Sequence, residues 1–288
     1  MTFTEKRLAY TFALDGGGSP IGISGLRSTC RIVASGPPTA GGIADIAIYG
    51  MSLSQMNSLT IMATKQLGNV KRNEISISAG DTNGMSLIYK GNVFAAWADA
   101  RAMPEVCFRI GATVQSYIDV QKIDPTSVKG SADVAQMFKG LAKQGQFSFE
   151  NNGVKTKLAN PYLSGSLGTQ MRELAEHAGC QWTIDKGVLA IWPTGKSRQG
   201  GGTLISPQTG MVGYPAFNEA GIIVTTLFNP AINYGQTVTV QSDITPACGQ
   251  WTIVRQEYNL EAVTHHGAWF LDLVLVTADG QEPSGDQG

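Results

Sequence analysis

The sequence predicts a mainly β protein with an α+β insert, in which two related β-barrel domains flank a small module of helices and hairpins. Three observations predict this fold. Short runs of alternating apolar and polar residues, separated by glycine and asparagine turn signals, fill both ends of the chain. Helical spacing of apolar residues marks the middle. Segments near the two ends resemble each other. The expected regions are a first barrel (1–122), an α+β insert (123–198), a second barrel (199–278) and a flexible tail (279–288).

The first region reads as a series of short antiparallel strands. In STCRIVAS (28–35), Cys30, Ile32 and Ala34 share one face, which is the period-two pattern of a strand with one side buried. Strands this closely spaced predict a closed or nearly closed antiparallel sheet. Further strands are expected at 7–14, 43–50, 57–63, 74–80, 86–96 and 101–114.

The middle region predicts two helices. In the segment 131–145, Ser131 is a plausible N-cap, Gly145 lies beyond the end, and the apolar face consists of Val134, Met137, Phe138 and Leu141. In the segment 166–179, Gly179 is a strong C-cap candidate, and the apolar face consists of Leu167, Met171, Leu174 and Ala178.

Two hairpins complete the insert. QFSFE (146–150) and VKTKL (154–158) are expected to pair with each other. CQWTIDKGVLAIWP (180–193) is expected to turn at Asp185-Lys186-Gly187. The glycine-rich stretch GKSRQGGGT (195–203) then reads as a mobile connector or loop tip.

Two comparisons predict an internal duplication. Placing Ala44 over Ala220 aligns Ile46 with Ile222 and brings Asn57 onto Asn233. The segments 86–113 and 251–278 share an order of strand, bend, continuing strand, turn and final long strand, with Ile88 aligned with Ile253 and Phe108 aligned with Phe270. The same order of elements on both sides of the insert predicts two copies of one domain.

The amino-acid composition excludes several classes of protein. The chain has 288 residues, of which 42% are hydrophobic and only 15% charged, and its net charge is −1. Typical proteins carry about 25% charged residues, so the low value suggests that neighbouring chains cover much of the surface. The sequence has no basic stripe of the kind that nucleic-acid binders carry, and no apolar stretch long enough to span a membrane. The four scattered cysteines (Cys30, Cys107, Cys180 and Cys248) suggest small apolar residues in a reducing setting.

No catalytic, cofactor or metal site is expected. His177 is interpreted as part of a solvated helix face, and His265-His266 as part of a hairpin turn, where adjacent side chains point to opposite faces. Gly16-Gly17-Gly18 is interpreted as a hairpin loop, because it lacks the spacing of a phosphate loop. Acidic pairs such as Asp279 and Glu282 lie in loose segments.

The five tryptophans admit two readings. Most lie in strands beside aliphatic residues, which favours packing in a core or interface over an aromatic platform for sugars. They are Trp97, Trp182, Trp192, Trp251 and Trp269.

Three segments, at 165–193, 205–242 and 251–276, carry a resemblance to the baseplate hub proteins of contractile-tailed bacteriophages and related injection machines. In that family a helix and a tryptophan hairpin precede a passage like GYPAFNEAGIIVTTLFNPAINYGQTVTVQS, followed by a closing strand like HGAWFLDLVLV. The resemblance implies two tube-type barrel domains per chain and a homotrimer whose pseudo-six-fold ring adapts the hexameric tail tube to the trimeric spike. It also implies a channel for DNA ejection.

The resemblance implies a virion protein of the tail baseplate, made in the host cytoplasm, without catalysis or cofactor. The implied partners are the tail tube or its distal initiator proteins, the central spike, the wedge proteins and a tape-measure protein in the lumen. DNA would be present only in transit. The main alternative is a carbohydrate- or receptor-binding β-module of a tail fibre or lectin, and an enzyme with two distant carboxylates is a third reading.

Overall fold

The computed structural model describes residues 5–15, 17–36, 41–60 and 73–277. The predicted tail, Gly16 and the end of the predicted strand at 57–63 lie outside the described residues. The first β unit consists of β1 (Arg7–Ala13), β2 (Ile21–Ser24), β3 (Ser28–Ser35), β4 (Ile43–Tyr49), α1 (Leu53–Leu59), β5 (Glu74–Asp81), β6 (Gly84–Asp99) and β7 (Cys107–Thr113).

The module and the second β unit follow in the chain. The module consists of α2 (Gln115–Ile118), β8 (Thr126–Ser127), β9 (Ser131–Asp133), α3 (Val134–Gln144), β10 (Ser148–Asn151), β11 (Lys157–Ala159), β12 (Tyr162–Leu163), α4 (Leu167–Ala178), β13 (Cys180–Asp185) and β14 (Val188–Pro193). The second β unit consists of β15 (Arg198–Ile205), η1 (Pro207–Thr209), β16 (Met211–Asn218), β17 (Gly221–Leu227), β18 (Gln236–Val240), η2 (Thr245–Ala247), β19 (Gly249–Ala262) and β20 (Trp269–Val276).

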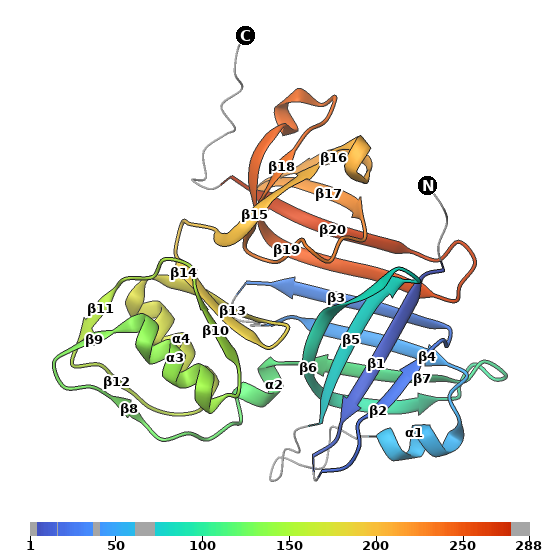
Figure 1. Ribbon diagram of the computed structural model, residues 1–288, viewed down its shortest axis with the longest axis horizontal. Helices are drawn as coiled ribbons and strands as arrows, with labels where there is room; N and C mark the ends of the chain where they lie inside the picture. The colour runs from blue at the N-terminus through green and yellow to red at the C-terminus, as the bar shows by residue number, and fades with distance from the viewer. Residues whose placement is uncertain (1–4, 16, 37–40, 61–72, 278–288) are drawn as a thin grey trace.

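The two β units share one long sheet. Thirteen strands of the described residues belong to it, and its main path runs β16-β17-β20-β19-β3-β4-β7-β6-β5-β1-β2. The units meet where β19 pairs antiparallel with β3, as Figure 1 shows at the centre of the molecule. The first half of β19 also pairs with β18, which pairs in turn with β15. The mainly β fold with an α+β insert is therefore confirmed, with 53% of the described residues in strands and 16% in helices.

The strand order makes the duplication visible. The first unit contains the path β3-β4-β7-β6-β5, and the second contains β16-β17-β20-β19-β18 in the same sequence of hairpins. Both β6 and β19 carry a bulge. In β6 it lies after Val93, in the pairing with β7, and in β19 it lies after Ile253, in the pairing with β20. A bulge bends its strand. Each long strand therefore serves two parts of its unit, because its first half pairs with β5 or β18 and its second half continues beside β7 or β20.

The shared bulge corrects the residue alignment. It makes Val93 the equivalent of Ile253, whereas the sequence comparison had aligned Ile88 with that residue. Following the pairings outward from the bulge also makes Phe108 the equivalent of Leu271, in place of Phe270. The sequence comparison slipped because it matched residue types, and the strand pairing that fixes the equivalence is not visible in either segment alone.

The same comparison extends to β4, which pairs with β7, and to β17, which pairs with β20. It makes Ala44 the equivalent of Ile222, in place of Ala220. Asn57 lies in α1, and Asn233 lies in the loop between β17 and β18. These two segments occupy the same place in the order of elements, but only the first contains a helix, so the duplication concerns the strands and not this connection.

One hydrophobic core runs through both β units. It contains Phe12, Ile46 and Phe108 from the first unit and Val224 and Leu271 from the second, all buried. The core lies on one face of the long sheet, because alternate residues of each strand point to it. The other face is partly open to solvent and is described below.

The connection after β4 differs from the expectation. A strand had been expected at 57–63, but the chain forms α1 there. Ser52 and Gln55 make a capping box, in which the Ser52 hydroxyl accepts from the Gln55 amide and the Gln55 side chain accepts from the Ser52 amide. Met56 and Leu59 are buried, so the helix covers the core, and Leu59 is the one apolar residue of the expected strand that lies within the described residues.

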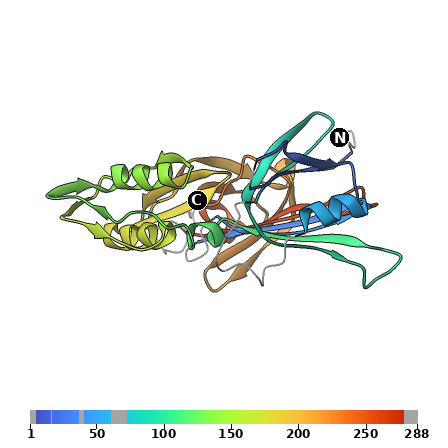
Figure 2. The same cartoon turned by 90° about the horizontal axis from the view of Figure 1, so that it is seen from below.

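The module has its own core between α3, α4 and the β10-β14-β13 sheet. It extends away from the β units along the longest axis of the molecule (Figures 1 and 2). Both helices and the β13–β14 hairpin are confirmed, and Gly179 ends α4 in the left-handed conformation with φ 61°. The N-cap of α3 is Asp133 instead of Ser131, because the Asp133 carboxylate accepts from the amide of Gln136 while Ser131 lies in β9.

The expected hairpin between 146–150 and 154–158 is wrong. β10 pairs in parallel with β14, and β11 pairs antiparallel with β9. The two segments therefore join different sheets. Their short length gave no register information, because a run of a few residues fits several partners equally well.

The expected connector at 195–203 is also wrong, because most of it forms β15, a strand parallel to β18. Gly201 permits this close approach, since a Cβ atom there would lie 2.3 Å from the carbonyl oxygen of Thr237. Here the absence of side chains serves tight strand pairing.

Candidate functional site: the exposed face of the long sheet

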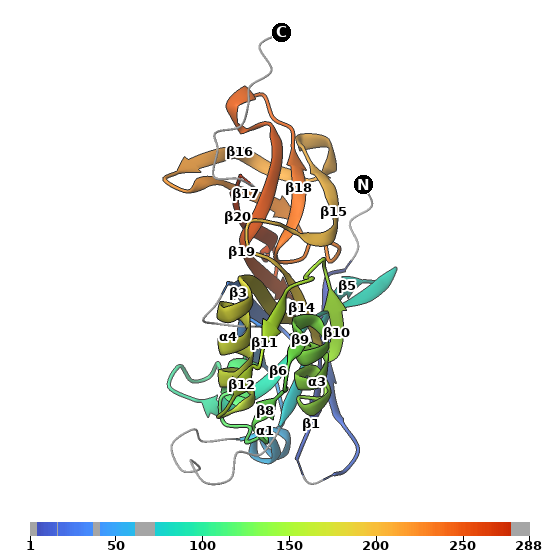
Figure 3. The ribbon, with the colours of Figure 1, turned by 90° about the vertical axis from the view of Figure 1, so that its left-hand side faces the viewer.

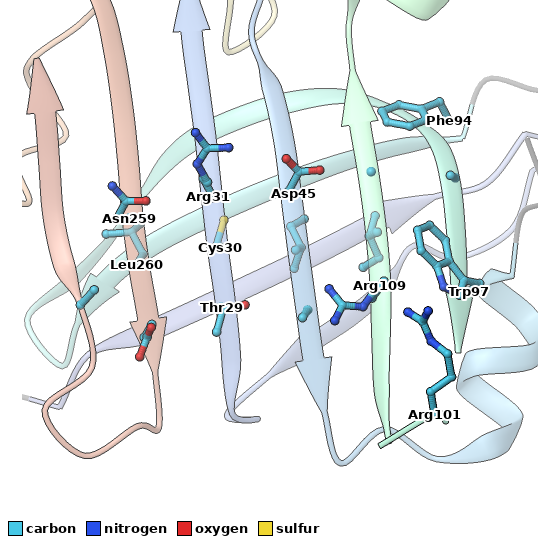
Figure 4. Close-up of a pocket in the computed structure, with 17 residues that line it drawn as sticks. Thr29, Cys30, Arg31, Asp45, Phe94, Trp97, Arg101, Arg109, Asn259 and Leu260 are labelled. Atoms are coloured by element: carbon cyan, nitrogen blue, oxygen red, sulfur yellow. The ribbon is translucent and has the colours of Figure 1, made fainter. Parts of the chain in front are cut away.

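The face of the long sheet opposite the core forms a shallow hollow of 860 Å³, lined by residues of β19, β3, β4, β7 and β6 (Figure 4). Arg31 lies directly across from Asp45 on β4, and Trp97 lies directly across from Arg109 on β7. The hollow therefore crosses the joint between the two β units. Arginines, carboxylates and aromatic rings line it side by side.

The charges near the joint are paired. Glu257 accepts from Nε of Arg31 at 2.6 Å and from Nη2 of Arg255 at 3.0 Å. Burial raises the pKa of Glu257, but the hydrogen bonds from the two arginines outweigh burial, and its pKa is lowered. Beside this group, Asp272 accepts from the Asn259 amide at 2.8 Å and from the Thr225 hydroxyl. Each carboxylate thus holds donors from neighbouring strands.

A second charge cluster lies at the β6 side of the hollow. Asp99 accepts from Arg101 through two contacts at 2.9 and 2.8 Å, and from Nε of Arg109 at 2.9 Å. The hydrogen bonds from Arg101 and then from Arg109 hold the pKa of Asp99 well below its usual range, so the carboxylate stays ionised at neutral pH. Positive charge on this face is consequently matched by negative charge at contact distance.

Paired arginines bind phosphate less readily than free ones, which gives a first prediction. We expect Asp99→Asn to strengthen binding to duplex DNA, because Arg101 and Arg109 lose their ionic partner. The slope of log K against log salt should grow by about two, one for each released arginine. Fluorescence anisotropy with a labelled duplex over a series of salt concentrations measures this.

The control for this prediction is Glu176→Gln, which makes the same change in net charge on an exposed position of α4. We expect the control to leave both affinity and slope at the wild-type value. Equal slopes for both variants would show that net charge, and not the pairing at Asp99, governs contact with DNA.

Arg198 holds the module against the second β unit. Its side chain is only 8% exposed, and it reaches two carboxylates of the module. Glu150 on β10 accepts from Nε and Nη2 at 3.0 and 2.9 Å, and Asp185 accepts from Nη1 at 3.0 Å. The hydrogen bonds from Arg198 lower the pKa of Glu150 more than burial raises it. This cluster joins β10, β13 and β15 across the boundary between the two parts.

Apolar and polar contacts continue the boundary around Arg198. The rings of Trp192 and Tyr234 pack at a centroid distance of 6.1 Å. Nζ of Lys186, in the turn of the β13–β14 hairpin, donates to Oδ1 of Asn233 at 2.6 Å. Figure 3 shows the helices of the module in front of the first β unit, and Figure 1 shows the β13–β14 hairpin directed towards the β units. The module is therefore fastened by several independent contacts.

The structure places the predicted candidate residues apart from one another. Trp182, Trp192 and Trp251 are buried, which confirms core packing for these three, while Trp269 is half-buried and Trp97 is 42% exposed in the hollow. The five tryptophans lie in five different strands, and these five side chains form no shared platform.

The histidines and glycines lie in the expected elements, but the rings of His265 and His266 pack at a centroid distance of 4.0 Å and so do not point to opposite faces. His177 is exposed on α4, and His265 and His266 occupy the turn between β19 and β20. Gly17 and Gly18 lie in the connection between β1 and β2, which pair antiparallel. Within 5–15, 17–36, 41–60 and 73–277, no group of three or more His, Cys, Asp or Glu side chains is arranged to hold a metal ion.

The cysteines pack as small side chains. All four are free thiols, and three of them (Cys30, Cys107 and Cys180) are buried. Burial raises the pKa of the Cys180 thiol to about 11, so it remains protonated at neutral pH. Among the helices of the described part of the chain, none combines the length and apolar character of a membrane span.

Sequence reasoning missed the ion pairs of Arg198 and Arg109. Arg198 was assigned to a mobile connector, and Arg109 to a strand without further role. A faint signal existed for Arg198, since a single arginine in a glycine-rich stretch of a weakly charged chain needs a counter-charge wherever it is buried. Its partners Glu150 and Asp185 are far away in sequence, so no local pattern could identify them.

The fold is that of phage tail proteins. It is similar to the 43 kDa tail protein of prophage MuSo2 from Shewanella oneidensis, with a TM-score of 0.60 and 13% identity over 94% of this chain and 97% of that one. It is also similar to a tail protein from Neisseria meningitidis MC58, with a TM-score of 0.59 and 10% identity over 96% and 99%.

A third similar structure is the Escherichia coli c3393 protein, with a TM-score of 0.58 and 12% identity over 95% of this chain and 79% of that one. That protein is described as a component of the type VI secretion system with structural similarity to the T4 bacteriophage tail proteins gp27 and gp5. At these identities the likeness concerns the fold alone.

A comparison of the sequence with models of protein families identifies the family of this chain. The family model described as "Baseplate hub gp41" matches residues 23–271, which is most of the chain, so the chain belongs to this family. Membership supports a structural role in a phage tail baseplate, a virion-associated location and association with other tail or baseplate proteins. No curated protein sequence matches the chain significantly.

Proposed function

We propose that this chain is the structural hub of a contractile phage tail baseplate. In this proposal three copies form a ring of six similar β units, which presents pseudo-six-fold symmetry to the tail tube and three-fold symmetry to the central spike. The ring surrounds a channel through which DNA is ejected. The chain works by assembly and without catalysis, metal or cofactor. Its division at about residues 122 and 198 separates two tube-type units from the module between them.

One observation carries the proposal most directly. The same strand order occurs twice in one chain, and the two copies are joined edge to edge within a single sheet. A duplicated unit in a trimer gives six similar positions from three chains, which is what an adaptor between six-fold and three-fold parts requires. A sheet that continues from copy to copy also satisfies its own edges.

The exposed sheet face supports a role as a channel lining. The arginines of this face are paired with Glu257 and Asp99, so passing DNA would meet few unpaired cations. A lining that leaves phosphates unbound suits transit better than retention. The tape-measure protein would occupy the same lumen before ejection.

The remaining partners follow from the position of a hub. The ring would contact the tail tube or its distal initiator proteins on one side, the spike on the other, and the wedge proteins at its rim. The protein would be made in the host cytoplasm and incorporated into the virion baseplate.

Light scattering of the purified chain, with negative-stain images of the same sample, tests the proposal. We expect a particle of three chains with a central hole. A stable monomer that binds glycans on an array would favour the lectin alternative instead. The burial of Trp182, Trp192 and Trp251 argues against that outcome, because these rings cannot offer a face to a sugar.

A further inference from the structure

The joint between the two β units is a pairing of two strand edges. The second half of β19 runs antiparallel along the whole of β3, from Arg255 opposite Ser35 to Ala262 opposite Ser28. Tyr258 lies opposite Ile32 in the middle of this joint, and both side chains are buried. The joint is therefore a strand pairing with an apolar centre.

Each surface of this joint has a second copy in the chain because of the duplication. The equivalent of β19 is β6, whose residues 94–99 pair with β7 on one side only within the described residues. The equivalent of β3 is β16, which pairs only with β17 within the same described ranges and ends the sheet path. One edge of each kind is thus open: β16 ends the sheet path, and the second half of β6 extends beyond its pairing with β5.

Large apolar side chains lie exposed at these two edges. Phe94 and Trp97 on β6 are 40% and 42% exposed, and Tyr214 and Phe217 on β16 are 64% and 57% exposed. At the joint inside the chain, the equivalents of Ala98 and Phe217 are Tyr258 and Ile32, which are 4% and 3% exposed. Exposed aromatic residues on an open strand edge are typical of a surface that another chain covers.

We propose that β16 of one copy of this chain pairs antiparallel with the second half of β6 of the next copy, repeating in trans the joint that β3 and β19 make in cis. The proposal rests on the proposed ring and specifies its contact. The occupant of each edge is a second copy because the chain already contains a complementary pair of such edges in contact. Head-to-tail pairing of two different edges closes into a ring when the rotation permits.

The register follows from the pairings within the chain. The common bulge makes Ala98 the equivalent of Tyr258, since they lie opposite Phe108 and Leu271 respectively. Ile32 pairs with Ala44 on the first unit, just as Phe217 pairs with Ile222 on the second.

Because Tyr258 pairs with Ile32 in the chain, Ala98 should pair with Phe217 of the next copy. The neighbouring pairs are then Trp97 with Asn218 and Asp99 with Ala216. The small Ala98 leaves room for the large Phe217 ring. Pro215, which cannot donate a backbone hydrogen bond, lies just outside these three pairs.

A cysteine pair tests the register on the full chain. We expect Ala98→Cys combined with Phe217→Cys to form intermolecular disulfides on mild oxidation, giving a covalent species of three chains on a non-reducing gel. The two single variants, when mixed, should give a two-chain product and nothing larger, because each cross-link then joins one edge of each kind. The matched control is Ala98→Cys with Ala216→Cys, whose second thiol points to the opposite face of the sheet.

The outcomes separate this inference from the proposed ring. A three-chain particle in light scattering that forms no Ala98–Phe217 link, or that links the control pair equally well, overturns the edge pairing and leaves the ring intact. A disulfide between two introduced cysteines of the same variant, Ala98→Cys with itself or Phe217→Cys with itself, overturns it too, because that requires two identical edges to meet. A chain that stays single at every concentration, without cross-links, overturns both.

A charge substitution gives a second readout without cysteine chemistry. We expect Phe217→Asp to raise the concentration at which three-chain particles form by about tenfold or more, since it removes a central apolar contact. Its melting temperature as a single chain should stay unchanged, because the side chain is exposed. Tyr162→Asp, which changes a 65% exposed aromatic residue of the module, is expected to leave assembly unaffected. Assembly of Phe217→Asp at the wild-type concentration would contradict the pairing.

Discussion

Phe108→Ala and Leu271→Ala are each expected to destabilise the whole protein in one cooperative transition. Phe108 and Leu271 are equivalent residues of the two β units, and both side chains are fully buried in the same core. Truncation leaves a cavity, and we expect losses in the free energy of unfolding of about 3–5 kcal/mol for Phe108→Ala and about 2–5 kcal/mol for Leu271→Ala. Urea denaturation, followed both by far-UV circular dichroism and by tryptophan fluorescence, measures these losses.

The cooperativity is the informative part of this experiment. The sheet and the core pass from one unit into the other without a break, so either substitution should shift the same midpoint with both probes. Leu53→Ala, at a 67% exposed position of α1, is the control and should change the free energy by less than about 0.5 kcal/mol. Two separate transitions, of which each variant shifts only one, would show that the units unfold as independent domains.

Sequence patterns predicted the elements that depend on local chemistry. The faces of α3 and α4, the C-cap at Gly179 and the turn of the β13–β14 hairpin follow from spacing and from residue types that favour one backbone conformation. The duplication was also detectable, because the order of strands and bends repeats. The long-sheet joint between β19 and β3 could not be predicted, since nothing local distinguishes an edge that pairs within its unit from one that pairs with the next.

The exposed face of the sheet was less predictable than its core. Residues such as Arg31 and Arg109 read simply as the polar half of an alternating strand. Their significance lies in partners on other strands, Glu257 and Asp99, which only the register brings to contact distance. Alternation within one strand does not fix which residues lie opposite on the next strand, so this charge pairing cannot be read from the sequence.

The segment around the buried Arg198 was predicted wrongly for a different reason. Glycines around Arg198 suggested mobility, yet the backbone there is a paired strand and the guanidinium is enclosed by carboxylates of the module. Composition rules describe the average behaviour of glycine-rich stretches in water. They fail where tertiary pairing requires glycine for close backbone approach, as at Gly201.

Arg198→Met is expected to lower the free energy of unfolding by about 3 kcal/mol. Removing one partner of a buried ion pair typically costs about 3–5 kcal/mol, because the remaining charges lose their counter-ion. The lower end applies here because Glu150 and Asp185 keep partial access to solvent, at 36% and 23% exposure. Arg172→Met is the control: its pair with Asp119 is exposed on both sides, and its loss should cost less than about 1 kcal/mol.

The acid dependence of stability identifies the interaction that is lost. The pKa of Glu150 is lowered in the folded protein from its ordinary value of 4.5, so the folded state binds its proton less readily than the unfolded state does. The stabilisation is therefore fully present above pH 4.5 and declines as the pH falls through the folded pKa. Arg198→Met should flatten this decline, and adding Glu150→Gln and Asp185→Asn should recover part of the stability by removing the unpaired charges. If Arg198→Met kept the wild-type decline below pH 4.5, the carboxylate of Glu150 would owe its ionisation to another group, and the module would be held by the contacts of Trp192 and Lys186 alone.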